Sequence, residues 1–162
     1  MKQEHNFVLG GLARNEKRGR YFPDGLFFTN DDCELATVPD GAFVLFESLR
    51  SGRARLIEGA SDGFVEVTGS LDMALEVVSD SSVEKDTEIL HDLYWRAGVE
   101  EYWLVDVRGE RLEFDIFKRG ARGYIAARKQ GGWLKSAIFG KSFRLTRGKD
   151  PLGNPEFTLH VR

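Results

Sequence analysis

The sequence lacks a second cysteine, so Cys33 cannot form a disulfide within the chain. It has no run approaching the roughly 18 apolar residues that a membrane-spanning helix needs, and its N-terminus has no apolar signal-peptide region. An excess of basic residues is also missing, because 23 Lys and Arg face 26 Asp and Glu, a formal net charge of −3. These absences predict a cytoplasmic protein with no membrane segment, and they count against tight, unspecific nucleic-acid binding.

The hydrophobic pattern predicts one mixed α/β domain over residues 1–162. Short apolar runs at 42–46, 64–67, 72–79 and 102–106 have the length and composition of buried strands. Between the last two, apolar residues at helical spacing predict a helix that starts at Ser81 or Ser82, with Ser81 and Glu84 as a capping box, and ends at Gly98. Residues 4–14 predict a shorter helix, which Gly10 and Gly11 weaken.

The C-terminal third predicts antiparallel hairpins. Leu112, Phe114 and Ile116 alternate with charged residues, a pattern typical of a half-exposed strand. Further hairpin segments follow at 123–129 and 133–145, and the tail predicts an edge strand. The expected fold is therefore a mixed β-sheet flanked by helices, with C-terminal β-hairpins.

Three carboxylates, Asp40, Asp72 and Glu76, lie beside or within otherwise apolar strands. Burying an unpaired carboxylate costs several kcal/mol, so a partner must offset that cost. Asp72 and Glu76 share one face of their strand, but a rise of about 3.3 Å per residue separates their Cα atoms by roughly 13 Å. Glu76 therefore needs a partner from a neighbouring strand, and Asp40 is the natural candidate.

Two interpretations of these carboxylates remain open. Oxygen ligands from two strands can hold Mg²⁺ together with several waters, and such an ion can act on a phosphodiester. Alternatively, Asp40 is a turn residue after Pro39, Asp72 begins a strand, and Glu76 belongs to a structural ion pair.

Residues 38–106 resemble the restriction-endonuclease-like family of the PD-(D/E)XK nuclease superfamily. The resemblance is carried by Pro39-Asp40, by the segment LDMALEVVS (71–79), by Asp86, and by the block AGVEEYWLVD (97–106). It implies a restriction-endonuclease-like core and a DNA endonuclease that requires Mg²⁺ or Mn²⁺. Many enzymes of this kind act as dimers, so a homodimer is expected by analogy.

The resemblance assigns Asp40 and Glu76 as metal-binding catalytic residues, with Asp72 as a further metal-ligand candidate. The motif lysine would fall at Val78, or in the following helix at Leu90, and is absent from both positions. Lys85 is the nearest remaining candidate for an ammonium that stabilises negative charge on the phosphate. Members of the family usually have a longer N-terminal segment, which can supply a further acidic residue to the site, and Glu4 is the candidate for that residue in this chain.

Two basic clusters are candidates for phosphate contacts. The first contains Arg50, Arg53 and Arg55, and the second contains Lys118, Arg119, Arg122, Arg128 and Lys129.

The sequence leaves two functions open for this protein. One is a metal-dependent DNA endonuclease, and the other is an inactive or weakened paralogue that binds nucleic acid or protein, which the missing lysine favours.

Overall fold

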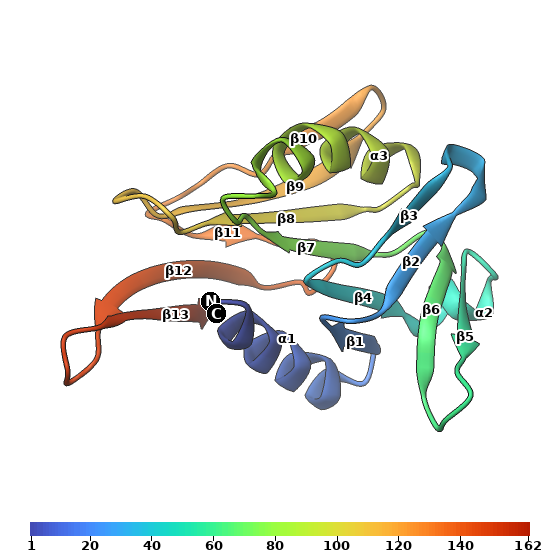
Figure 1. Ribbon diagram of the computed structural model, residues 1–162, viewed down its shortest axis with the longest axis horizontal. Helices are drawn as coiled ribbons and strands as arrows, with labels where there is room; N and C mark the ends of the chain where they lie inside the picture. The colour runs from blue at the N-terminus through green and yellow to red at the C-terminus, as the bar shows by residue number, and fades with distance from the viewer.

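The computed structural model describes residues 1–162 and is built around a six-stranded mixed sheet (Figure 1). The strand order is β1-β4-β7-β8-β9-β10, and only β7 and β8 run parallel to each other. The strands are β1 (Gly19–Pro23), β4 (Gly41–Leu45), β7 (Met73–Val77), β8 (Glu101–Asp106), β9 (Glu113–Gly120) and β10 (Gly123–Ala126).

A helical crossover joins the parallel strands β7 and β8, as parallel pairing requires. It consists of a π-helical segment, η2 (Lys85–Ile89), followed by α3 (Leu90–Arg96). Gly98 follows with a φ of 77°, which confirms the predicted helix end. The predicted capping box does not form, because no side chain caps η2 and the Ser82 hydroxyl bonds instead with the Ser79 amide and the Asp86 carboxylate.

Two smaller sheets flank the central one. The first has the order β3-β2-β6-β5, and the second is the C-terminal antiparallel sheet β11-β12-β13, in which β13 is the predicted edge strand. Their strands are β2 (Phe27–Asn30), β3 (Leu35–Thr37), β5 (Ala54–Glu58), β6 (Phe64–Gly69), β11 (Leu134–Lys135), β12 (Ser142–Lys149) and β13 (Pro155–Val161). The hairpin segment predicted at 123–129 is β10 of the central sheet, and the segment predicted at 133–145 is divided between β11 and β12. The remaining short helices are η1 (Asp31–Cys33) and α2 (Phe46–Arg50).

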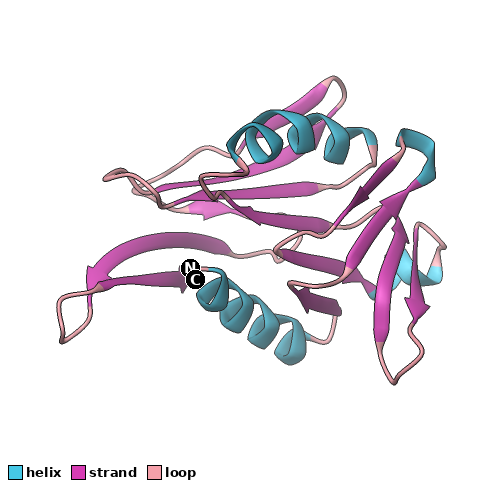
Figure 2. Ribbon diagram, in the orientation of Figure 1, coloured by secondary structure: helices cyan, strands magenta, loops and turns pink.

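The N-terminal helix α1 (Lys2–Glu16) is longer than the sequence predicts. Gly10 faces β1, where a Cβ would lie in ordinary van der Waals contact, 3.8 Å from the ring of Tyr21, so the packing does not require a glycine there. Helices are few and strands dominate (Figure 2), and none of the helices combines the length and apolar character needed to cross a bilayer.

The central sheet separates two hydrophobic cores. On β7, Met73, Leu75 and Val77 join the core shared with α1 and β12, whereas Ala74 joins the core shared with α3. Full burial of a side chain such as Leu75 contributes about 2 kcal/mol to stability. The same alternation turns Glu76 toward the α3 side of the sheet, so its carboxyl group is buried between the sheet and the helix.

Candidate functional site

The structure brings Asp40 and Glu76 together at the junction of β4 and β7. Gly41 pairs with Leu75 in the antiparallel register, so Asp40 and Glu76 occupy the next opposed positions. Asp40 Oδ2 accepts a hydrogen bond of 2.7 Å from the Val77 amide, which fixes its carboxylate against β7. Both residues are buried, with exposed fractions of 8% and 3%. Two adjacent strands thus present two carboxylates to one small volume.

Glu76 is held in a strongly desolvated position. Its Oε1 accepts a hydrogen bond of 2.5 Å from the Tyr94 hydroxyl on α3. Burial raises the pKa of Glu76 to about 8, and the negative charges of Asp40 and Asp86 add to that effect, while Tyr94 and Lys85 oppose it. Without a bound cation, Glu76 therefore carries a proton at neutral pH.

Asp86 is a third carboxylate of this site, and the sequence reasoning gave it no role. It lies in η2 with 2% of its surface exposed, and burial raises the pKa of its carboxyl group. Oδ2 accepts a hydrogen bond from Ser82, but Oδ1 is buried without a hydrogen-bond partner. No spacing signal identified this role, because only tertiary packing buries Asp86.

Two lysines approach the carboxylates from different elements. Lys85 is half-exposed, and its Nζ lies 4.0 Å from Asp86 Oδ1. Lys2, on α1, places its Nζ 2.5 Å from Asp40 Oδ1 and 3.8 Å from Asp24. The hydrogen bond to Asp40 raises the pKa of the Lys2 ammonium. Lys2 was missed because sequence spacing gives no hint that α1 packs beside Asp40.

Asp72 does not join the other carboxylates. It lies at the opposite end of β7, where Oδ1 accepts hydrogen bonds from Arg53 at 2.7 Å and from Ser48 at 2.9 Å. Its Oδ2 accepts a hydrogen bond of 2.7 Å from the Leu45 amide. Both oxygens are therefore engaged in a buried structural ion pair, and the expected role of Asp72 as a metal ligand has no geometric support.

The arginines that were predicted to contact phosphates do not form one surface. Arg53 turns inward to Asp72 and also donates to the Gly98 carbonyl, so its guanidinium is engaged within the protein. Arg50 is exposed beside Glu47, and Arg55 is exposed on β5. The second cluster separates in part, because Lys129 pairs with Asp115 and Arg119 lies over the Trp95 ring, whereas Lys118 and Arg128 line one pocket.

Glu4 does not reach the carboxylates, because its side chain accepts a hydrogen bond from the Leu159 amide on β13.

The donor set suits a hard divalent cation, although the side chains do not already form a closed cage. No three His, Cys, Asp or Glu side chains converge closely enough to hold an ion in this conformation. Mg²⁺ is commonly bound by one or two carboxylates, with waters and phosphate oxygens completing its shell. Asp40 and Glu76 fit that requirement if a cation displaces the half-exposed Lys2 from Asp40 Oδ1, and Asp86 Oδ1, which has no hydrogen-bond partner, is a buried acceptor available to a bound water.

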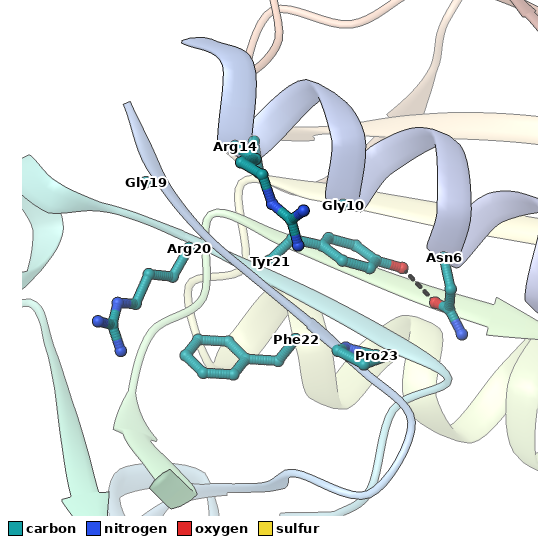
Figure 3. Close-up of a pocket in the computed structure, with 9 residues that line it drawn as sticks. Asn6, Gly10, Arg14, Gly19, Arg20, Tyr21, Phe22 and Pro23 are labelled. Atoms are coloured by element: carbon teal, nitrogen blue, oxygen red, sulfur yellow. Dashed lines mark hydrogen bonds between the residues drawn. The ribbon is translucent and has the colours of Figure 1, made fainter. Parts of the chain in front are cut away.

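The largest cavity lies beside this site, between α1 and β1 (Figure 3). Its volume is about 650 Å³, and its lining includes Asn6, Gly10, Arg14, Arg20 and Tyr21. The Tyr21 hydroxyl donates a hydrogen bond of 2.6 Å to Asn6 Oδ1 across the cavity. Burial raises the pKa of Tyr21, and the nearby charge of Asp40 contributes, so this phenol stays protonated.

Comparison with known proteins agrees with this architecture. A family model described as "Putative restriction endonuclease" (Uma2) matches residues 5–146. A crystal structure from Anabaena variabilis, described as a "putative nuclease belonging to DUF820", superposes with a TM-score of 0.61 at 14% identity, covering 86% of this chain and 71% of that one. No curated protein matches the sequence. The chain therefore belongs to the Uma2 restriction-endonuclease family and has the restriction-endonuclease-like fold.

Proposed function

We propose that the protein is a Mg²⁺- or Mn²⁺-dependent endonuclease of the PD-(D/E)XK type that hydrolyses phosphodiester bonds in DNA. One observation carries the proposal: Asp40, just before β4, is held by the Val77 amide beside Glu76 of the adjacent β7, both are buried, and the charge of Asp86 also acts on Glu76. Family membership supports a nuclease. A structural role alone gives no reason to bury Glu76 where the charges of Asp40 and Asp86 both act on it.

Asp40 and Glu76 would hold the cation, which when bound supplies positive charge to the phosphodiester and to an attacking water. The Val77 amide and the Tyr94 hydroxyl orient the two carboxylates. Glu76 must lose its proton to bind a cation, and Asp86 is placed to accept a hydrogen bond from a water in the site.

The ammonium that such a site needs has two candidates in this chain. Lys85 is the sequence-based choice, and it is close enough to lower the pKa of Glu76. Lys2 already contacts Asp40, and its half-exposed side chain can move to an approaching phosphate. Positive charge beside the developing phosphorane stabilises the transition state, so either lysine meets the chemical need.

A second function, a catalytically weakened binding module, is favoured by the loss of the motif lysine. Leu90 and Val78 occupy the two positions where the resemblance expects it, and both are buried at 2% and 4% exposure. Leu90 packs in the same core as Tyr94 and Ala74, so no ammonium can come from that helical position.

Plasmid nicking in Mg²⁺ and in Mn²⁺ tests the proposal. We expect metal-dependent nicking that Glu76→Gln and Asp40→Asn abolish. Lys2→Met or Lys85→Met, whichever supplies the ammonium, should reduce the rate at least tenfold, while Lys149→Met, an exposed lysine without an ion pair, should leave it unchanged. Equal nicking by the Glu76 variant would reveal a contaminant. Absence of nicking, with no rise in melting temperature on adding metal, would refute the endonuclease and support the binding module.

Homodimerisation and a cytoplasmic location remain predictions. Sedimentation velocity over a range of protein concentrations tests the first, and cell fractionation tests the second.

A further inference from the structure

The cavity between α1 and β1 carries positive charge that no side chain neutralises. Arg14 and Arg20 line it, and Lys17 and Arg18 lie in the connection between the two elements. None of these four cations has a carboxylate within 4.0 Å, and no acidic residue lines the cavity. In a chain with net charge −3, such a local excess of cations favours an anionic ligand.

One side of α1 connects this cavity to the carboxylates. Lys2, Asn6, Gly10 and Arg14 are spaced four residues apart and therefore share one side of the helix. Lys2 contacts Asp40, Asn6 accepts a hydrogen bond from the Tyr21 hydroxyl, and Gly10 leaves room above the Tyr21 ring. The Arg14 side chain reaches from α1 toward β1 at the far end of the cavity (Figure 3).

Tyr21 forms the boundary between the cavity and the carboxylates. Its hydroxyl lies so close to Gly41 that a Cβ on that residue would collide with it. Gly41 directly follows Asp40, and it pairs with Leu75 next to Glu76. Only the Tyr21 ring therefore lies between the cavity and the backbone of the residue that follows Asp40.

The length of this surface fits a run of phosphates. Twelve residues separate Lys2 from Arg14, which corresponds to about 18 Å along an α-helix. One strand of B-form DNA carries a phosphate about every 3.4 Å along the helix axis, so roughly five phosphates span that length. Arg20 extends from β1 away from Arg14, with its guanidinium 5.0 Å from the Phe64 ring centroid, and widens the positive surface (Figure 3).

We infer that the groove between α1 and β1 binds the phosphate backbone of the nucleic-acid substrate, with Arg14 and Arg20 contacting phosphates several nucleotides from the bond at Asp40 and Glu76. This inference rests on the proposed nuclease function. It replaces the predicted contact surface at Arg50, Arg53 and Arg55, where Arg53 is already engaged with Asp72.

Equilibrium binding of a fluorescein-labelled 20-base-pair duplex, followed by anisotropy in EDTA, tests the groove without requiring cleavage. Arg14→Ala/Arg20→Ala should weaken binding at least tenfold and make the slope of log affinity against log salt shallower by about two. Arg111→Ala/Lys149→Ala removes the same charge from two exposed residues without ion pairs, and it should bind like the wild type. Circular dichroism should show that both double variants are folded.

The other possible results distinguish failure of the groove from failure of the nuclease function. No binding by the wild type, or equal binding by the wild type and the Arg14/Arg20 variant, overturns the groove, even if Glu76-dependent nicking establishes the nuclease. An equal loss in the control variant also overturns it, because bulk charge would then explain the binding. Arg14-dependent binding without any metal-dependent nicking would instead refute the nuclease and leave a nucleic-acid-binding groove.

Discussion

Replacing Glu76 by glutamine should stabilise the protein, and the gain should grow with pH. Glu76 is 3% exposed, and its pKa is raised to about 8 by burial among other carboxylates. Between pH 4.5 and about 8, Glu76 is protonated in the folded state but ionised in the unfolded state. Over that range the Glu76 carboxyl group therefore lowers the free energy of unfolding more and more as the pH rises. The glutamine side chain is neutral throughout, and its amide oxygen can still accept the Tyr94 hydrogen bond.

The size of the effect follows from about 1.4 kcal/mol per pH unit. At pH 7 the ionisation cost that glutamine removes is about 3 kcal/mol, and at pH 5 it is at most about 1 kcal/mol. For a chain of this size, a difference of 3 kcal/mol corresponds to a rise in melting temperature of roughly 6–12 °C.

Urea unfolding of both proteins at pH 5, 6, 7 and 8, with EDTA present, measures this difference. The free energies of unfolding should diverge by about 3 kcal/mol between pH 5 and pH 8, with the variant more stable. Curves that stay parallel within about 1 kcal/mol would show that the Glu76 carboxylate is solvated or paired, and the account of a desolvated site would be wrong.

Three further outcomes follow from the same structure. Glu101→Gln should have the opposite effect and lower the free energy of unfolding in urea by about 2–4 kcal/mol. Both oxygens of the buried Glu101 carboxylate accept hydrogen bonds, among them those from Ser136 and the Ala137 amide, and the glutamine NH₂ group would face one of these donors with a donor of its own. Arg53→Met should cost about 3 kcal/mol by leaving Asp72 without its ion-pair partner, yet it should not change duplex affinity at a temperature where the variant stays folded. Mn²⁺ binding, measured by calorimetry, should strengthen about tenfold per pH unit from pH 6 toward pH 8 and then level off, since Glu76 must release a proton first. A pH-independent affinity would remove Glu76 from the ligand set.

The side of the strand that Glu76 faces could be predicted from local rules, whereas the adjacency of β4 and β7, which are not consecutive along the chain, was an assumption that the structure supports. Alternation along a strand fixes which residues share a face, and adjacent strands bring opposed residues within about 5 Å. The buried strands and the Gly98 helix end were predictable for the same reason, since short-range periodicity and backbone preferences determine them.

The contributions of Lys2, Asp86 and Arg53 could not be predicted, because tertiary packing decides them. Lys2 reaches Asp40 only once α1 has docked against β1, and a long flexible side chain leaves no spacing signal. Arg53 lies in a Gly- and Ser-containing loop typical of a solvent-exposed cation, but the fold closes that loop over Asp72. Asp86 sits in a helical turn that is polar in sequence, and only the fold, in which the Tyr102 hydroxyl on β8 donates to the Asp86 carbonyl, buries it.

The two ends of the chain lie beside each other and close to the site, and this affects how the protein should be handled in the laboratory. The N- and C-termini lie side by side (Figure 1). Helix α1 packs against β13, where Glu4 accepts the Leu159 amide hydrogen bond, and Lys2 in the first turn of α1 contacts Asp40. A polyhistidine tag on Met1 or Arg162 would bring imidazoles, which bind Mn²⁺ themselves, near these carboxylates. Metal titrations therefore need tag-free protein, or a tag inserted at the turn between β9 and β10.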